Sequence, residues 1–412
     1  METLIERCCG LDVHQATVVA CLLIWEGGER PRKEVRTFGT MTADLKAMAA
    51  WLKEAGCTHI GMESTGVYWM PVYAVLEQGF KLVVGNAAHI KNVPGRKTDV
   101  KDSEWIADLL RHGLIRSSFV PGKEQRELRD LTRYRRKLMD SQASERNRLI
   151  KLLEGANIKL ASVASNVFGV SGRLIVRALI AGTATPEMMA KLAKGKLRSK
   201  TAELALALDG RIDAHHRFLL EMQLERVEQV EASIGRLDER IDAQLEPVRE
   251  IHTRLMQIPG IDWIGAAVIV AELGVDMTVF PTPQQAAAWA GVAPGNNRTA
   301  GKRRAETSRR GNIHLTTALV QAAMAAARKR GSYFKEKYWR LKAKRGPRRA
   351  AMAVAHKILI AAYHMLKAGT GFHDLGGAYL DKLVQSQVKN RLVHRLEQMG
   401  YAVTLDSKGG LA

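Results

Sequence analysis

The stretch of sequence that decides the N-terminal fold is CGLDVHQATVVACLLIW, residues 9–25. Its two ends are rich in Val, Ile, Leu and Cys, as strands are, and a polar break from Asp12 to Thr17 separates them. A short polar break between two apolar runs predicts one strand that turns into a second. The acidic Asp12 then lies where the chain leaves the first strand.

More strand and helix signals follow along the next 60 residues. We expect strands at 33–38, 59–63 and 81–84, and helices at 42–55 and 68–78. Strands that are separated by helices indicate an α/β sheet in which some strands pair in parallel. The first 120 residues are therefore predicted to form an α/β domain.

From Gly122 onward the pattern changes to long helices. The first of them has apolar residues at helical spacing and a crowd of basic residues on its remaining surface: Arg126, Arg129, Arg133, Arg135, Arg136 and Lys137. Farther on, apolar residues between Leu220 and Ile258 recur at a mean step of about 3.5, which is the period of a coiled coil. Pro247 interrupts this pattern and should kink or end a helix there.

Positive charge is concentrated in one part of the chain. The 412 residues include 63 Lys and Arg against 42 Asp and Glu, a formal net charge of +21. Residues 301–349 alone hold 16 Lys and Arg and two acids, so they supply two thirds of that charge. The block runs through turns and helices instead of forming one amphipathic stripe, which favours nucleic acid over a membrane surface as partner. Hydrophobic (46%) and charged (25%) residues occur at globular proportions, which argues against disorder.

Three features favour a cytoplasmic protein without a membrane partner. The four cysteines lack CxxC spacing and are expected to be buried thiols of a reducing compartment: Cys8, Cys9, Cys21 and Cys57. The N-terminus lacks the basic start and apolar run of a signal peptide. The most apolar longer stretch, 261–279, contains three acids, Glu272 among them, and is a poor membrane span.

Four acidic residues are candidate metal ligands. Asp12 follows the first strand, Glu63 ends the strand at 59–63, and Asp99 and Asp102 lie three residues apart in TDVKDSEWIADLL. On a helix this spacing points both carboxylates to one face. Carboxylates from two strand ends and a nearby helix could converge on one or two Mg²⁺ ions, which clamp the attacking and leaving oxygens of a phosphodiester. Each acid by itself has the alternative role of a surface charge or helix cap.

Five motifs stand in order along the chain: GLDVHQATVVACL, GMESTGVYW, NAAHIKNVPGRKTDVKDSEWIADLLRHGLI, QIPGIDWIGAAVIVAELG and AGVAPGNNRTAGKRRAETSRRGN. Together they resemble the DEDD transposases of bacterial insertion sequences, of the insertion-sequence-110 type. The resemblance is close over residues 7–120 and 255–330, and general over the helices between them.

This resemblance implies a domain order. An α/β ribonuclease-H-like (RuvC-like) nuclease domain in residues 1–120 precedes a long helical coiled-coil domain in 121–254, a mostly α C-terminal transposase domain with a helix-hairpin-helix in 255–372, and a helical tail in 373–412. The resemblance also implies that Asp12, Glu63, Asp99 and Asp102 form an Mg²⁺-binding catalytic tetrad. A hydroxyl of the C-terminal domain is then the nucleophile that attacks DNA.

The residue that carries this hydroxyl departs from the family pattern. The family has a serine followed by a small residue, Gly and Lys, and the matching stretch here is Arg298-Thr299-Ala300-Gly301-Lys302. A threonine hydroxyl can attack phosphorus, although its methyl group crowds an in-line approach. Three interpretations stay open, and we favour the first: Thr299 is the nucleophile, Ser308 serves instead, or this copy is weakened or inactive.

Five basic residues near Thr299 are expected to hold phosphates: Lys302, Arg303, Arg304, Arg309 and Arg310. A nucleotide-binding loop is excluded, because five residues separate Gly295 from Gly301 and Arg303 follows the lysine. The sequence IPGI at 258–261 resembles a helix-hairpin-helix, whose turn presents backbone N–H groups to phosphate. Its alternative is a plain turn that leads into a core helix.

The resemblance further implies the partners. These are DNA at the element ends and the target, and a structured guide RNA from the element. The chain is expected to form homodimers that pair into tetramers through the coiled-coil stretch, which makes the active sites composite. The expected location is the bacterial cytoplasm, at the nucleoid. Two rival functions stand beside DNA transposition: a RuvC-like Holliday-junction resolvase that uses metal-activated water, and an inactive nucleic-acid-binding relic.

Overall fold

Two compact units, Met1–Pro121 and Gly122–Ala412, make up the chain. The computed structural model describes residues 4–28, 30–93, 101–294, 298–299, 302–303 and 311–405. Within these ranges, no helix combines the length and the apolar character that crossing a bilayer requires.

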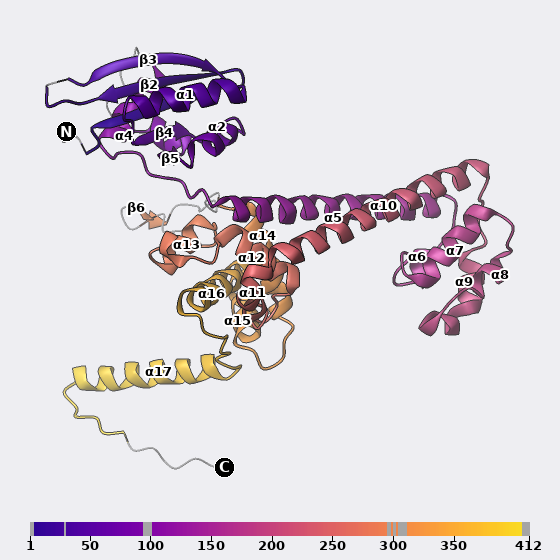
Figure 1. The fold of residues 1–412 in the computed structure, drawn as a ribbon. Coiled ribbons are helices and arrows are strands. Elements are labelled where there is room, and N and C mark those ends of the chain that lie inside the picture. Colours follow the sequence, from indigo (N-terminus) through magenta and orange to yellow (C-terminus); the bar gives the residue numbers. More distant parts are fainter. Residues whose placement is uncertain are drawn as a thin grey trace. The chain divides into compact units, whose positions relative to one another are not determined.

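A mixed five-stranded sheet forms the first unit, in the order β3-β2-β1-β4-β5 (Figure 1). Its strands are β1 (Arg7–Val13), β2 (Thr17–Ile24), β3 (Arg32–Gly39), β4 (His59–Glu63) and β5 (Lys81–Gly85). β1, β2 and β3 pair in antiparallel fashion, whereas β1, β4 and β5 pair in parallel. The turn predicted within residues 9–25 is confirmed, and the N–H of His14 donates to the carbonyl oxygen of Thr17 (2.9 Å) to close it.

Helices cover both faces of this sheet. They are α1 (Thr42–Glu54), α2 (Trp69–Leu76), α3 (Ala87–Lys91) and α4 (Asp102–Arg111). Side chains of β1 alternate between the two faces: Cys9 and Leu11 belong to the core that α1 and α2 close, whereas Cys8 packs with Ala107 of α4. The prediction of an N-terminal α/β unit with parallel pairing is therefore confirmed.

Two glycines let α4 approach the sheet closely. Gly10 of β1 and Gly61 of β4 are register partners. A Cβ atom on Gly10 would lie 2.2 Å from the carbonyl oxygen of Ser103 and 2.3 Å from the nitrogen of Ala107. A Cβ atom on Gly61 would lie 3.1 Å from Ile106 of the same helix. Only a residue without a side chain fits between β1 and the backbone of α4.

All four cysteines are buried free thiols in the first unit, as expected. Burial raises the pKa of Cys8, Cys21 and Cys57 to about 12, and the pKa of Cys9 also lies well above its usual value for the same reason. Thiols with so high a pKa hold almost no thiolate at neutral pH. They are therefore unreactive core side chains.

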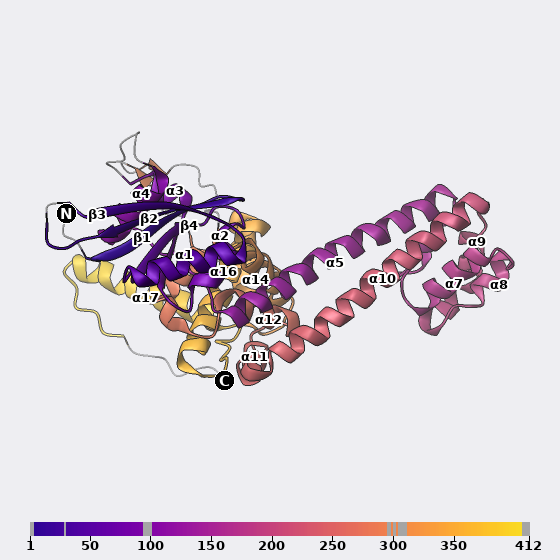
Figure 2. The same ribbon diagram turned by 45° about the horizontal axis from the view of Figure 1, so that its top comes forward.

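The second unit is helical and begins with a long hairpin of α5 (Lys123–Gly155) and α10 (Ala214–Gln244), which lie side by side (Figure 2). Short elements between these two helices enclose an apolar core at one end of the hairpin: α6 (Leu160–Val163), α7 (Val170–Ala181), α8 (Pro186–Ala190), the 3-10 helix η1 (Gly195–Lys200) and α9 (Thr201–Ala207). We call residues 156–213 the tip.

The coiled-coil period of α10 is satisfied within the chain. The residues of this seam are buried, and α10 packs on α5: Leu220, Leu224, Val227, Val230, Ile234 and Ile241. The connection within the hairpin keeps α5 at a high effective concentration beside α10. This favours α5 over a helix of another subunit as the partner of α10. The seam that we expected to join subunits is thus occupied by α5 of the same chain. α10 ends at Gln244, before Pro247, as predicted.

The remaining helices pack together as the C-terminal part of this unit. They are α11 (Arg249–Leu255), α12 (Trp263–Leu273), α13 (Pro283–Trp289), α14 (Ile313–Ala326), α15 (Tyr333–Arg345) and α16 (Pro347–Ala368), with the 3-10 helices η2 (Glu246–Val248) and η3 (Met277–Val279). The two short strands β6 (Arg298–Thr299) and β7 (Lys302–Arg303) precede α14, and α17 (Tyr379–Gln398) follows α16.

The Pro-Gly turn between α11 and α12 is packed inside this unit. Ile258 is buried, and Gly260 has a φ of +89°. A Cβ atom on Gly260 would lie 2.1 Å from the carbonyl oxygen of Ala322 in α14. Asp262 caps α12 by accepting a hydrogen bond from the N–H of Gly265 (2.8 Å). Protein backbone against the turn and a carboxylate at the helix start both disfavour phosphate, so these contacts favour the plain-turn interpretation.

Candidate active site

Asp12 and Glu63 are neighbours at the carboxyl ends of two parallel strands. The last register pair of β1 and β4 is Leu11 with Met62, and each acid is the next residue of its strand. Because side chains alternate along a strand, both acids lie on the sheet face of the glycines two positions earlier, which is the face that α4 covers. The sheet therefore presents two adjacent carboxylates on one face of one edge.

The start of α4 is directed toward the same edge. The thiol of Cys8 lies 3.6 Å from the carbonyl oxygen of Ala107, whereas Gly10, farther along β1, faces Ser103. The helix therefore runs antiparallel to β1. Its first residue, Asp102, lies toward the carboxyl end of that strand.

Local side chains orient both strand-end acids. Nε2 of His14 lies 3.0 Å from Oδ2 of Asp12, and the hydroxyl of Thr65 donates to the carboxylate of Glu63. Each partner stands two positions after its acid, so the chain that leaves the strand holds the carboxylate. The side chain of Asp12 is 28% exposed, which leaves it accessible to a ligand from solvent.

The predicted tetrad is only partly visible. Asp99 lies outside the described residues, and α4 begins at Asp102, so the helix face that we predicted for this pair is not part of the described geometry. Among the described side chains, no group of three or more His, Cys, Asp and Glu is arranged to hold a metal ion. The structure brings Asp12 and Glu63 together and directs the start of α4 toward them.

Thr299 lies in a two-stranded ribbon of the second unit. β6 pairs in antiparallel fashion with β7, with Thr299 opposite Lys302 and Arg298 opposite Arg303. The other predicted residues of this region lie outside the described ranges: Arg304, Ser308, Arg309 and Arg310.

The chain segments before and after this region lie against each other. A Cβ atom on Gly311 would lie 2.3 Å from the nitrogen of Gly291. The N–H of Asn312 donates to the carbonyl oxygen of Trp289 (3.2 Å). We call this crossing, residues 289–291 with 311–312, the loop stem. Residues 292–310, which include Thr299, therefore start and end at one place in the unit.

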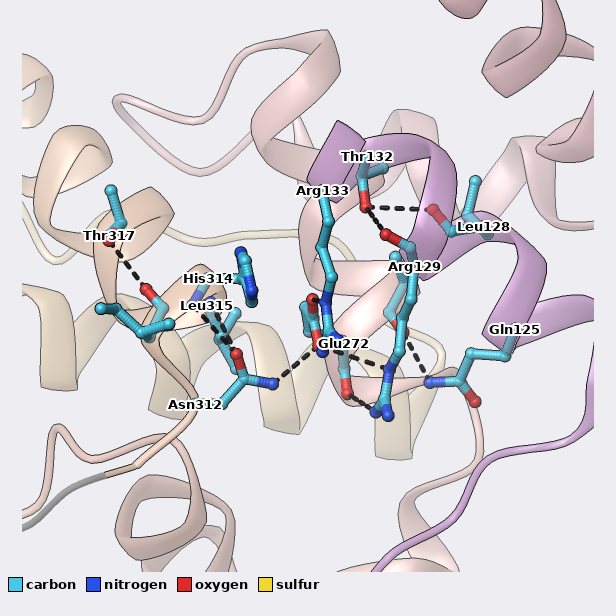
Figure 3. Close-up of polar contacts among 12 residues, drawn as sticks. Gln125, Leu128, Arg129, Thr132, Arg133, Glu272, Asn312, His314, Leu315 and Thr317 are labelled. Atoms are coloured by element: carbon cyan, nitrogen blue, oxygen red, sulfur yellow. Dashed lines mark hydrogen bonds and ion pairs between the residues drawn. The ribbon is translucent and has the colours of Figure 1, made fainter. Parts of the chain in front are cut away.

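A buried carboxylate joins the loop stem to two helices (Figure 3). Glu272 of α12 is 0% exposed, and its oxygens accept hydrogen bonds from Nε and Nη2 of Arg133 in α5 at 2.7 and 2.8 Å. The side-chain amide of Asn312 donates to the same carboxylate (2.7 Å), and Nε of Arg129 lies 3.3 Å from it. One carboxylate thus connects α5, α12 and the loop stem.

The side chain of Asn312 both contacts Glu272 and caps α14. Its amide nitrogen contacts Glu272, and its side-chain oxygen accepts hydrogen bonds from the N–H groups of His314 and Leu315, both at 3.1 Å (Figure 3). The second pair of bonds caps α14. The end of the loop and the start of α14 are therefore positioned by a single side chain.

The charge of Glu272 is stabilised by its partners. Burial by itself raises the pKa of this carboxyl group, but the hydrogen bonds from Arg133 and Asn312 and the charges of Arg133 and Arg129 outweigh burial. The net result is a pKa below the usual value. Glu272 is therefore ionised at neutral pH.

The sequence pattern does not predict this cluster. It indicates a basic surface on the first long helix that includes Arg129, Arg133 and Arg135, yet the first two contact Glu272 and the third pairs with Asp238 of α10. The signal that could have revealed the cluster is a single glutamate within the apolar run of α12. A buried carboxylate of this kind requires a cationic partner.

Two family models match the chain, one on either side of the tip. Residues 9–158 match a transposase model of the DEDD IS110 type, and residues 252–339 match the model described as "Transposase IS116/IS110/IS902 family". The two matches together cover more than half of the chain. The protein therefore belongs to the IS110 family of transposases, as the five motifs predict, and is a DNA transposase.

Relatives from two bacteria are similar over most of their length. The chain is 26% identical over 272 residues to the "Probable family 20 transposase" of Pseudomonas aeruginosa. The aligned region covers 65% of this chain and 71% of the relative. The chain is also 25% identical over 358 residues to the "Transposase for insertion sequence element IS1111A" of Coxiella burnetii. That alignment covers 84% of this chain and 86% of the relative.

Proposed function

We propose that this transposase cuts and rejoins DNA strands with Mg²⁺ bound by Asp12, Glu63, Asp99 and Asp102, and with the hydroxyl of Thr299 as nucleophile. The observation that carries the proposal is the pairing of Asp12 and Glu63 at adjacent strand ends, with α4 starting toward them. An Asp in a first strand, a Glu that ends a later strand and acids near a following helix form the layout of the ribonuclease-H-like (RuvC-like) nucleases.

The donor set is suited to this metal. It consists of carboxylate oxygens, which hard divalent cations prefer as ligands. When bound, Mg²⁺ would position the phosphate and offset the negative charge of the attacking and leaving oxygens. His14 and Thr65 hold the carboxylates of Asp12 and Glu63 in fixed orientations for this purpose.

Thr299 performs the bond exchange in this proposal. Its Oγ gives up its proton and forms a bond to phosphorus, while the bond from phosphorus to the leaving sugar oxygen breaks and that oxygen takes up a proton. The phosphate ester is conserved as a protein–DNA link, so the reverse step can rejoin a strand. Nearby cations balance the phosphate charge: Lys302, Arg303, Arg304, Arg309 and Arg310.

We further propose that a structured RNA of the element guides the choice of DNA, and that homodimers pair into tetramers in the bacterial cytoplasm, at the nucleoid. The cationic block at 301–349 supports a polyanionic partner. Because α5 occupies the seam of α10, we propose that the subunits meet through another surface.

Thr299→Ala is expected to reduce formation of the covalent protein–DNA link by about 10³-fold or more. Thr299→Ser should keep or raise it, because serine lacks the methyl group that crowds the in-line approach. Purified protein is incubated with Mg²⁺, the RNA that flanks the element and junction DNA. The link is then detected as a protease-sensitive band on a denaturing gel.

Two further variants separate the rival functions. A link that survives Thr299→Ala and disappears in Ser308→Ala would assign the nucleophile to Ser308. Strand cleavage without any link, unaffected by Thr299→Ala, would indicate a resolvase that hydrolyses with water. Asp12→Ala should abolish cleavage, and a wild-type protein that cleaves no better than this variant would be an inactive relic.

Replacement of Lys302, Arg303 and Arg304 by glutamine in one triple variant should weaken DNA binding. It should also make the binding less dependent on salt. Each lost phosphate contact flattens the slope of log affinity against log salt by about one unit, so we expect a change of roughly three. Fluorescence anisotropy across a salt series measures this slope. An unchanged slope would remove the three residues from the DNA interface.

A further inference from the structure

The tip has no part in the proposed reaction, yet it contains a concentrated set of cations. Half of the residues from 191 to 200 are basic, and all of these are exposed: Lys191, Lys194, Lys196, Arg198 and Lys200. No acidic residue occurs between positions 188 and 202. We call residues 191–200 the basic tip segment.

The basic tip segment is fixed by its apolar residues and its backbone. Ala193 is buried, and Leu192 and Leu197 pack against the core of the tip. The N–H of Lys194 donates to Oγ of Ser171 in α7 (2.9 Å). Because the apolar residues are anchored, the cations stand at defined positions on the outside of the tip.

Two cations in α7 of the tip are neutralised by acids of α10. Arg173 pairs with Glu231 and Arg177 with Glu228, both at 2.7 Å. Within the basic tip segment, all of which the structure describes, only Lys200 has an acid within the ion-pair distance of 4.0 Å, at 3.7 Å. Among the described residues, the other four cations of the basic tip segment therefore have no acid within ion-pair distance, unlike Arg173 and Arg177.

Like charges in one short segment repel each other, so this arrangement does not stabilise the fold by itself. A partner with a row of negative charges would offset this repulsion among the cations. The apolar residues of the segment point into the tip, which leaves no apolar face to enter a lipid surface. Since the chain is a DNA transposase, we propose that the basic tip segment binds the phosphate backbone of duplex DNA that flanks the reacting site.

The length of α5 indicates which DNA the tip contacts. Arg133 of α5 contacts Glu272, and Leu153 of the same helix belongs to the core of the tip. A rise of 1.5 Å per residue over these roughly 20 residues gives about 30 Å along the helix. This corresponds to about nine base pairs of duplex DNA. Lysines that contact phosphates read no bases, so the contact is independent of sequence.

The test replaces Lys194, Lys196 and Arg198 together with glutamine in the full-length protein. Binding to a random duplex of about 40 base pairs is measured by fluorescence anisotropy between about 50 and 200 mM KCl. We expect weaker binding and a slope of log affinity against log salt that is flatter by roughly 2.7, about 0.9 for each lost phosphate contact. The exposed positions of these side chains predict an unchanged melting temperature.

A matched control removes the same charge from cations that acids of the chain already neutralise. It combines Arg148→Gln, Lys159→Gln and Arg177→Gln, whose partners are Glu145, Glu154 and Glu228. The slope should change by less than about one unit in this control. Equal slope changes in both triple variants, or none in either, would overturn the proposal.

Two other outcomes would also overturn it. A slope change with RNA of the same length but none with DNA would assign the segment to RNA. Met188 and Leu206 of the tip are 56% and 80% exposed, so a second copy of the chain is the rival partner. Sedimentation of both variants measures self-association, and its loss in the tip variant with unchanged DNA binding would assign the segment to a protein contact.

Discussion

Gly10→Ala is expected to lower the free energy of unfolding of the first unit by about 3 kcal/mol or more. The added Cβ would stand 2.2 Å from the carbonyl oxygen of Ser103 and 2.3 Å from the nitrogen of Ala107. Both are backbone atoms of α4, which cannot rotate away, so the helix must move off the sheet. Asp102 moves with it, and Mg²⁺-dependent strand cleavage should fall together with the urea midpoint measured by circular dichroism.

Gly79→Ala is the matched control in the same unit. A Cβ atom there would meet nothing within 4 Å, and Gly79 is not among the glycines with positive φ. The free energy of unfolding of this variant should stay within a few tenths of a kcal/mol of the wild-type value, or rise slightly because alanine restricts the unfolded chain. Equal midpoints for Gly10→Ala and Gly79→Ala would mean that α4 does not cross β1 this closely in solution.

Glu272→Ala is expected to cost about 3–5 kcal/mol of the stability of the second unit. The substitution leaves the guanidinium groups of Arg133 and Arg129 without their counter-charge, and Asn312 loses its acceptor. The loop stem then loses its connection to α5 and α12. Because residues 292–310 include Thr299, formation of the protein–DNA link should fall more than DNA binding does.

Glu231→Ala separates a local effect on the loop from a general loss of stability. Glu231 also accepts hydrogen bonds from two arginines, but it lies on the α5–α10 hairpin and is 28% exposed. Its loss should cost about 1 kcal/mol and leave the link yield per folded molecule unchanged. If Glu272→Ala and Glu231→Ala lower that yield equally, the position of Glu272 beside the loop stem has no special effect.

The lowered pKa of Glu272 also predicts how stability depends on pH. The folded state favours the ionised carboxylate, so the stabilisation is complete above the unfolded-state pKa of 4.5 and is lost as the pH falls through the lower folded-state value. Glu272→Gln should therefore flatten the acid side of the stability curve. Urea unfolding between about pH 3 and 7 measures this, and parallel curves for both proteins would contradict it.

Local patterns in the sequence were sufficient for the elements and for part of the site. Residues 9–25 predict a strand, a turn and a second strand because apolar runs and a polar break are read within one segment. The strand predicted at 59–63 has those bounds in the structure, which places Glu63 at a strand end. The structure pairs β1 in parallel with β4, although β2, β3 and α1 lie between them in the chain, and this pairing makes Asp12 and Glu63 neighbours.

The sequence by itself thus determined the fold class, the strand ends that hold two acids and the family. Only the tertiary structure decided that Gly10 faces the backbone of α4, that α10 packs on α5 of its own chain, and that Glu272 gathers Arg133 and Asn312. The physical reason is distance along the chain. Arg133 and Glu272 are 139 residues apart, and hydrophobic periodicity shows that a face or a charge is buried without showing what covers it.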